Sequence, residues 1–385
     1  MKKTNFKIAL LFCLGGLGLP FLTSAANLYF LPSFQDFYQG ESLIVELRLN
    51  TEGEEINALE TKIMFPVEIL EVVDTNLGGS VLTIWPKEPT FSNSSGEISF
   101  IGGMPKGFSG DGLLAKIIFR AKSIGSANLK FTENSQALLN DGNGTKVDLV
   151  FLEGVYDILA KPEGLPIVFS STHPDETKWF HSSTIHLHWD LAEETEYSFV
   201  LSHDPSVEPD DLPDKPERWV GDIEYPGLED GIYYFFLKQR VVGGKWTEKT
   251  SLRIMIDATP PEPFIPKIGK EKSVYEGKYF LSFSAEDKAS GVDYYEVYES
   301  KKELFKKESS SGWKKVKSPY VLENQLLNGV IKVRAVDKAG NERIVEVVLP
   351  AKPFPYKTAG IIIFLLLILI VIIARRKVKK TVKLE

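Results

Sequence analysis

The 385-residue sequence has almost no cysteine, because Cys13 is the only one. A single cysteine excludes a disulfide framework within the chain, so each domain must be stabilised by burial of its own apolar core. Cys13 lies in an apolar stretch, residues 8–22, that follows three N-terminal lysines and precedes four small residues. This order is typical of a secretory signal peptide, and we expect residues 1–26 to be removed after Ala25 or Ala26. An uncleaved signal anchor is the alternative.

Catalytic and nucleotide-binding motifs are also absent. The sequence has no P-loop, dinucleotide-binding fingerprint, G-x-S-x-G elbow, H-E-x-x-H helix or C-x-x-C pair. Acidic residues are so numerous that no carboxylate pair stands out, although a glycosidase would need two acids held at a set separation. We therefore expect no enzymatic activity, no catalytic residue and no cofactor.

Excess positive charge is missing from the central part of the chain. The net charge is −7, and both terminal segments are basic, so the residues between them are more acidic than the whole. An acidic surface argues against nucleic acid or anionic lipid as the main ligand, although it also simply favours solubility. We expect no nucleic-acid partner.

One long hydrophobic run is present near the C-terminus. Residues 358–374 carry no charge and are followed by the basic residues of the tail, 375–385. The run is at the short end of what spans a ~30 Å hydrocarbon layer. Basic flanks face the cytoplasm, so we predict a transmembrane helix with the tail inside and the preceding ectodomain outside the cell membrane. A buried core helix is the alternative.

Residues 27–158 show short alternating apolar patterns punctuated by glycine-rich turns. Apolar side chains alternate with polar ones over residues 43–49 and 58–65, for example, and no long amphipathic helix pattern appears. Period-two alternation predicts half-buried strands. The sequence therefore predicts an all-β domain, a sandwich of about nine strands.

Several stretches of this first domain carry a family resemblance. They are Ile56-Asn57-Ala58-Leu59-Glu60, Phe65-Pro66, Leu70-Glu71-Val72-Val73, Gly96-Glu97-Ile98-Ser99-Phe100, Gly112-Leu113-Leu114-Ala115-Lys116-Ile117 and Asn140-Asp141-Gly142-Asn143-Gly144-Thr145. Together they resemble the strands and turns of cohesin domains. The resemblance implies a jelly-roll β-sandwich shared with cellulose-binding modules. It also implies a non-catalytic module that binds a dockerin-type protein partner or a polysaccharide.

The same resemblance implies a contact surface. In cohesins the partner docks on the outer face of one sheet, which includes the strand that residues 58–65 resemble. Glu60 and Lys62 are the outward residues there. Trp85 and Phe91 in the adjoining stretch are candidate anchors, since exposed aromatic side chains dominate interface energetics and also stack on sugars. The alternative is that both aromatic side chains belong to the core and that Glu60 and Lys62 are merely solvated.

Two further β-rich segments follow, at residues 159–257 and 258–350, each preceded by a proline-containing linker. Their most characteristic stretches are Lys178-Trp179-Phe180, Asp230-Gly231-Ile232-Tyr233-Tyr234-Phe235 and Val333-Arg334-Ala335-Val336-Asp337-Lys338-Ala339-Gly340-Asn341. These stretches resemble immunoglobulin- or fibronectin-like modules of bacterial surface proteins. The resemblance implies spacer modules and names no ligand.

Metal-binding residues are weakly indicated. His186 and His188 project from one face of a predicted strand, a spacing that can hold a metal, but no third ligand is placed by spacing. Asp287 and Asp337 could bind calcium at a module end, although as turn-forming residues they need no ion. We therefore expect no metal site.

These features predict a single-pass cell-surface protein with an extracellular N-terminal ectodomain. Its cohesin-like domain would be displayed on two immunoglobulin-like spacers and would bind an extracellular protein partner or a glycan. The alternative is a purely structural stalk or adhesin without a dedicated small ligand. An exposed aromatic strip on the first domain would favour binding, whereas a sheet face with only charged residues and threonine would favour the stalk.

Overall fold

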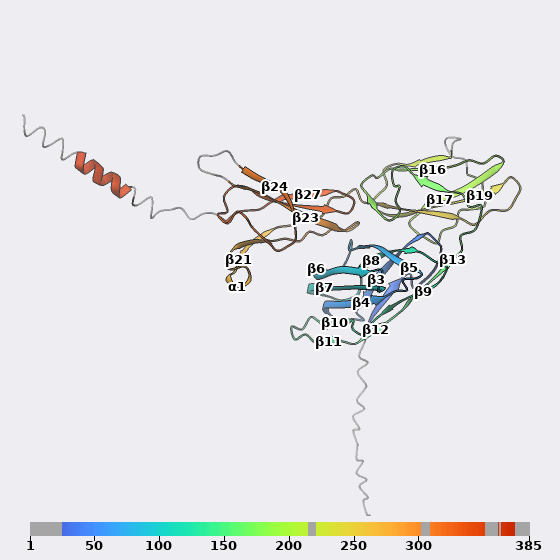
Figure 1. The fold of residues 1–385 in the computed structure, drawn as a ribbon, viewed down its shortest axis with the longest axis horizontal. Helices are drawn as coiled ribbons and strands as arrows, with labels where there is room; N and C mark the ends of the chain where they lie inside the picture. Colours follow the sequence, from blue (N-terminus) through green and yellow to red (C-terminus); the bar gives the residue numbers. More distant parts are fainter. Residues whose placement is uncertain (1–24, 215–220, 302–308, 351–360, 362, 374–385) are drawn as a thin grey trace, which may run out of the picture. The chain divides into compact units, whose positions relative to one another are not determined.

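The computed structural model describes residues 25–214, 221–301, 309–350, 361 and 363–373 (Figure 1). The chain divides into two compact units. The first comprises residues 1–264, 284–295 and 334–344, and the second comprises residues 265–283, 296–333 and 345–385. The predicted signal peptide lies outside the described residues except for Ala25 and Ala26, and the predicted cytoplasmic tail lies wholly outside them.

Thirteen strands near the N-terminus of the first unit form a β-sandwich, the first sandwich. They are β1 (Ala26–Leu31), β2 (Phe34–Tyr38), β3 (Ser42–Asn50), β4 (Ile56–Met64), β5 (Leu70–Asn76), β6 (Ile84–Ser92), β7 (Glu97–Phe108), β8 (Asp111–Ala121), β9 (Gly125–Phe131), β10 (Gln136–Leu139), β11 (Lys146–Val147), β12 (Leu149–Phe151) and β13 (Gly154–Leu159). The smaller sheet has the order β12-β1-β3-β8-β5. In the larger sheet the order is β11-β10-β4-β9-β13-β2, and β7 joins β4 to β6.

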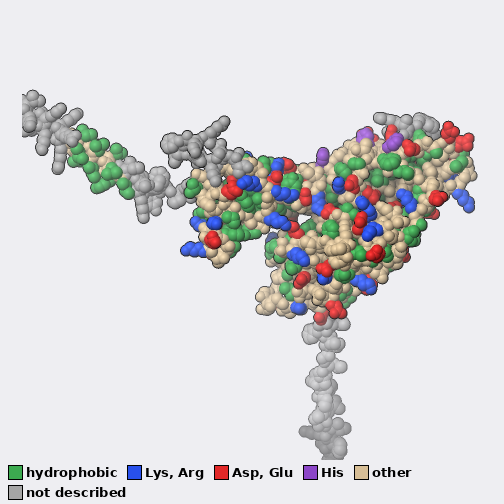
Figure 2. Space-filling model, in the orientation of Figure 1, with side chains coloured by type: hydrophobic (Ala, Val, Ile, Leu, Met, Phe, Trp, Pro, Cys, Tyr) green, Lys and Arg blue, Asp and Glu red, His purple; other side chains and the backbone are tan. Residues whose placement is uncertain are grey.

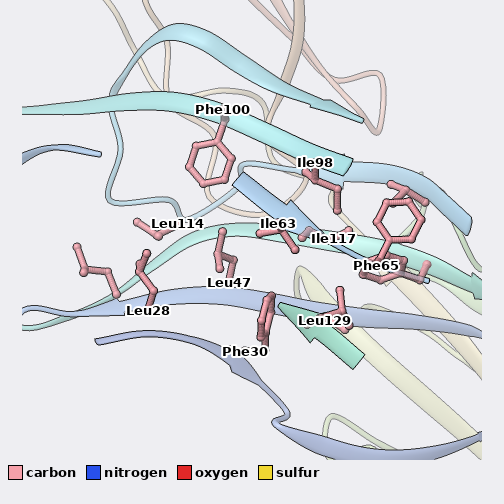
Figure 3. Packing of buried hydrophobic residues seen from close by; sticks show 14 of the residues in the cluster. Leu28, Phe30, Leu47, Ile63, Phe65, Ile98, Phe100, Leu114, Ile117 and Leu129 are labelled. Atoms are coloured by element: carbon pink, nitrogen blue, oxygen red, sulfur yellow. The ribbon is translucent and has the colours of Figure 1, made fainter. Parts of the chain in front are cut away.

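The alternation seen in the sequence sets which side chains enter the core. In β3, every second residue from Leu43 to Leu49 is buried, and β4 buries Leu59, Thr61 and Ile63. Figure 3 shows side chains from both sheets, among them Leu47 and Ile63, directed into the space between the sheets. The predicted all-β class and sandwich architecture of this domain are thus confirmed, but the prediction of about nine strands is wrong, since the domain has thirteen, several of them only two to four residues long.

At one edge of each sheet of the first sandwich, strands from opposite ends of its sequence pair with each other. The N-terminal strand β1 pairs in parallel with β12, and β2 pairs in parallel with β13. These pairings join the beginning and the end of the domain in both sheets. The outer faces of the two sheets have different surroundings, as described below.

A second sandwich, also in the first unit, follows in the sequence. Its strands are β14 (Val168–Ser170), β15 (Trp179–Phe180), β16 (Ile185–Trp189), β17 (Thr195–Ser202), β18 (Asp222–Tyr225), β19 (Gly231–Val241) and β20 (Thr250–Ile256). They form a three-stranded sheet, β14-β16-β18, and a four-stranded sheet, β15-β20-β19-β17. Between the sheets, the ring of Trp189 packs within 6.2 Å of the rings of Tyr197, Phe199 and Phe235. This aromatic group forms the centre of the core.

The remaining strands form another pair of sheets, and their residues are distributed over both units. They are β21 (Lys267–Lys270), β22 (Tyr279–Ser282), β23 (Val292–Lys301), β24 (Ser309–Val316), β25 (Tyr320–Val321), β26 (Ile331–Asp337) and β27 (Glu342–Glu346), with the short helix α1 (Lys272–Tyr275) between β21 and β22. The sheet orders are β21-β22-β25 and β24-β23-β26-β27.

The predicted membrane segment, residues 358–374, lies partly outside the described residues. Residue 361 and residues 363–373 are helical, and their side chains are exposed. None of the helices formed by the described residues is long and apolar enough to span a membrane.

Candidate binding face and aspartate cluster

The outer face of the larger sheet of the first sandwich carries the residues predicted to make contacts. Because Leu59, Thr61 and Ile63 point into the core, Glu60 and Lys62 point outward from β4. The neighbouring strand β7 is antiparallel to β4, and Lys62 lies opposite Ser99 in the register. We call this outer surface of β4, β6 and β7, together with the segment from β10 to β12, the β4–β7 face.

Charged side chains on the β4–β7 face are held by short contacts. Lys62 Nζ lies 2.7 Å from Glu97 Oε2, and Lys87 Nζ donates to Ser99 Oγ at 2.8 Å. Glu60 Oε2 accepts a hydrogen bond of 2.9 Å from Gln136 Nε2. These contacts link β4 to β7 and β10, and β6 to β7. They orient the charges, while partial solvent exposure keeps each contact weak in energy.

A hollow of about 790 Å³ lies on this face. It is bordered by side chains of both signs and by a few apolar ones: Glu60, Lys62, Lys87, Glu97, Ser99, Ile101, Glu133, Gln136, Lys146, Asp148, Leu149 and Phe151 are among its lining residues. Figure 2 likewise shows acidic and basic side chains interspersed over the surface of the first sandwich. The hollow is therefore polar and is suited to a partner that brings hydrogen-bonding and charged groups of its own.

The two aromatic candidates differ in how much surface they offer. Trp85 is half-buried and packs against the core, with its ring 5.7 Å from that of Phe100 in an edge-to-face contact. Phe91, in contrast, is 41% exposed, as is Ile84 at 51%. The structure thus shows no broad aromatic platform at Trp85. The contact roles of Glu60, Lys62, Trp85 and Phe91 stay predictions.

The opposite outer face of the first sandwich is covered by other parts of the same compact unit. Ile44, Val73 and Ile118 point outward from the smaller sheet and pack against apolar residues of the second sandwich and of two later loops. Those residues are Trp179, Ile232, Met255, Ala289 and Ala339. We call this contact region the junction. Among the described residues, no comparable group of apolar side chains covers the β4–β7 face, which is the other outer face of this sandwich.

A buried arginine completes the junction. Arg253 of β20 is 3% exposed, and its guanidinium donates to the Ser42 carbonyl at 3.1 Å, to Ser42 Oγ at 2.6 Å and to the Glu176 carbonyl at 2.8 Å. Ser42 Oγ in turn donates to Glu176 Oε1 at 2.8 Å. Burial lowers the pKa of Arg253, although Glu176 opposes this. The fork of the guanidinium thus joins strand β3 of the first sandwich to two segments of the second.

The histidine candidates lie on an exposed strand face. His186 Nε2 is 3.3 Å from Glu224 Oε2, and His188 Nδ1 is 2.6 Å from Asp222 Oδ1 on the neighbouring strand β18. Figure 2 shows histidine side chains at the surface of the second sandwich. In the part of the chain that the structure describes, neither histidine belongs to a group of three metal-ligating side chains.

The residues that do form such a group are aspartates. Asp257, Asp287 and Asp337 each bring one carboxylate oxygen within 4.8 Å of the others. Burial raises the pKa of Asp287 to about 7, with the carboxylates of Asp257 and Asp337 adding to the rise, and burial also raises the pKa of Asp337. The sequence indicated Asp287 and Asp337 as possible ligands, but Asp257 reads as part of a proline-rich linker. The sequence signal for Asp257 as a possible ligand is its position directly after a buried strand.

Comparison with known proteins gives structural neighbours only. No protein-family model matches the chain, and no curated protein matches it. A non-cellulosomal cohesin from Archaeoglobus fulgidus is similar over 36% of this chain and 93% of its own, with 20% identity and a TM-score of 0.30. A type I cohesin–dockerin complex from Clostridium thermocellum is similar over 35% and 100%, with 13% identity and a TM-score of 0.30. CaCohA2 from Clostridium acetobutylicum is similar over 35% and 92%, with 16% identity and a TM-score of 0.30.

Proposed function

We propose that this chain is a non-catalytic surface protein whose first sandwich binds a protein partner of dockerin type on the β4–β7 face. The observation that carries the proposal is the difference between the two outer faces of this sandwich. One is covered at the junction, whereas the other presents a hollow of about 790 Å³. The resemblance of residues 56–145 to cohesin domains supports the same face. We interpret the later sandwiches as immunoglobulin- or fibronectin-type spacers.

The chemistry of the face favours a protein over a polysaccharide. Lysines and glutamates line the hollow together with a few apolar side chains, among them Leu149 and Phe151, and Ile84 and Phe91 are exposed on strand β6. Interfaces between proteins combine such charges, which set orientation and association rate, with a few apolar anchors. A polysaccharide site would instead be expected to offer an aromatic stacking platform. Glycan binding is therefore the second candidate.

The first test is binding of the purified protein to a panel of dockerin domains and to a glycan array. For a dockerin that binds, we expect the double variant Glu60→Lys/Lys62→Glu to weaken affinity roughly tenfold or more, because reversed charges meet like charges on the partner. Lys130→Glu is the matched control. Lys130 is an exposed lysine on the same sheet, paired with Glu153 at 3.1 Å, and it does not line the hollow.

Two results would count against the proposed site. The double variant leaves the net charge unchanged, whereas Lys130→Glu lowers it by two. Equal losses in the two variants would therefore mean that the affinity does not depend specifically on the charges at Glu60 and Lys62. If the folded protein binds none of the dockerins and none of the glycans, the result would favour the structural stalk. If the protein binds only glycans, and the double variant loses this binding, the proposed site would stand but its ligand would be a glycan and not a protein.

We also propose that the ectodomain is secreted and held at the cell membrane by residues 358–374, as their apolar composition and basic flank indicate. Cleavage after Ala25 fits the fold best, since Ala26 is buried and its amide donates to the Asp148 carbonyl at 3.0 Å. We expect the full chain to fractionate with membranes and to be digested by protease added to intact cells. A variant lacking residues 358–385 should appear in the medium. Recovery of the full chain in the soluble intracellular fraction would contradict the proposal.

A further inference from the structure

Three aspartates from distant segments meet within the first compact unit. Asp257 follows β20, Asp287 lies in the loop after β22, and Asp337 is the last residue of β26. One carboxylate oxygen of each lies within 4.8 Å of the other two, and Asp257 and Asp337 are at most 2% exposed. Three ionised carboxylates at this distance repel one another unless a positively charged group or ion lies between them.

Lysine and arginine side chains do not supply that charge. Among the described residues, no lysine or arginine forms an ion pair with any of the three carboxylates. Lys288 and Lys338, each next to one of the aspartates in sequence, pair instead with Glu262 at 2.8 Å and with Asp74 at 2.6 Å. The hydrogen bonds that the cluster accepts come from neutral donors, the side-chain amide of Asn341 and backbone amides such as that of Gly291. The negative charge is therefore left without a cationic partner from the protein.

A separate observation concerns the buried hydroxyl of Ser290. Ser290 is 0% exposed, and its Oγ has no hydrogen-bond partner among the described residues. The amide of the same residue donates to Asp257 Oδ2 at 3.1 Å. Bond lengths keep a serine Oγ within about 4 Å of its own amide nitrogen. A buried polar oxygen without a partner is costly, and this one belongs to a residue whose amide already binds the cluster, so a ligand held at the cluster would give it a partner.

We propose that Asp257, Asp287 and Asp337, together with the Ser290 hydroxyl, bind a divalent cation, with calcium as the preferred ion. Carboxylate and hydroxyl oxygens are hard ligands, which suit calcium and magnesium and not zinc or copper. Calcium accepts six to eight oxygens in flexible geometry, whereas magnesium demands a regular octahedron. Three carboxylates on separate segments suit the more tolerant ion.

The site lies where it would fix the junction. Asp257 ends the second sandwich, and the loops that carry Asp287 and Asp337 also contact the first sandwich. Asn76 Nδ2 donates to the Ser290 carbonyl at 2.7 Å, and Lys338 Nζ donates to the Thr75 carbonyl. A bound cation would therefore hold the linker and both loops in the arrangement that covers the smaller sheet. This inference does not depend on the identity of any partner of the β4–β7 face.

The test is calorimetric titration of the EDTA-treated full chain with calcium chloride, and separately with magnesium chloride, alongside thermal unfolding. We expect one calcium site per chain with a Kd in the range of about 10⁻⁴ to 10⁻³ M, typical of extracellular modules. Saturating calcium should raise Tm by several degrees, and magnesium should act more weakly. Asp287→Asn and Asp337→Asn should each abolish the Tm shift, and Ser290→Ala should weaken calcium binding severalfold.

Asp141→Asn is the control, because Asp141 is an exposed aspartate in a glycine-rich turn of the first sandwich and should leave calcium binding unchanged. If an asparagine variant fails to fold, Ser290→Ala and the calcium dependence of Tm in the unmodified chain still decide the question. Absence of a saturable heat together with an equal Tm in calcium and in EDTA would overturn the proposal, leaving a shared proton to neutralise the cluster. Calcium binding that persists in both asparagine variants would also overturn it.

Discussion

Arg253→Met should weaken the junction more than any other single polar substitution. The guanidinium is buried and donates to two backbone carbonyls and to the Ser42 hydroxyl. Methionine fills much of the same volume but leaves these acceptors without donors in a site that water does not reach. Hydrogen bonds to charged groups and buried acceptors without partners each count for about 1.5–3 kcal/mol, so we expect a loss of about 3–5 kcal/mol.

Differential scanning calorimetry of the full chain measures this effect. We expect the first and second sandwiches to unfold together in the unmodified protein and in separate transitions in Arg253→Met. Arg240→Met is the control, since Arg240 lies on the adjacent strand β19, where its half-buried side chain pairs with Glu196 at 2.7 Å and lies 4.4 Å from the centre of the Trp246 ring. Surface ion pairs contribute about 0–1 kcal/mol. Equal effects of the two substitutions would show that Arg253 does not couple the sandwiches.

Phe100→Ala should damage both the stability and the binding face of the first sandwich. Phe100 is 1% exposed in β7, and its ring contacts that of Trp85 in β6. Truncation of a buried phenylalanine costs about 3–5 kcal/mol, because apolar contacts are lost and a cavity remains. β6 would also lose the contact that holds Trp85, so we expect weaker partner binding wherever the variant still folds.

Chemical denaturation compares this variant with Phe91→Ala in the same domain. Phe91 is 41% exposed and lies opposite Ile98 at the other end of the β6–β7 pair. Its truncation should change stability by about 0.5 kcal/mol or less while reducing affinity if Phe91 is a contact residue. A large loss of stability in Phe91→Ala would contradict its placement at the surface. No loss of stability in Phe100→Ala would contradict its placement in the core.

The regular strands of the first sandwich could be predicted from sequence alone. In β3 and β4 the alternation of apolar and polar residues holds for the whole length of the strand, and the structure buries the expected set. That regularity also determines that Glu60 and Lys62 point outward, because a strand with one face in the core must present the other. Sequence therefore located two residues of the candidate face without any tertiary information.

The placement of Trp85 could not be predicted in the same way. The pairing of β6 with β7 shifts register between Ile84 and Lys87 and again between Lys87 and Thr90, and β6 contains Pro86 and Pro89. Each irregularity breaks the period-two rule, so the side of the sheet that a residue faces no longer follows from its position. Only the packing against Phe100 decides that Trp85 turns towards the core.

The sequence by itself thus determined the all-β class, the phase of the regular strands and the outward direction of Glu60 and Lys62. Tertiary structure alone decided that Arg253 reaches Ser42, 211 residues away in sequence, and that Asp257 meets Asp287 and Asp337. The reason is physical. Alternation is imposed locally by strand geometry, whereas the junction and the aspartate cluster depend on which distant surfaces pack together, and no short-range pattern encodes that choice.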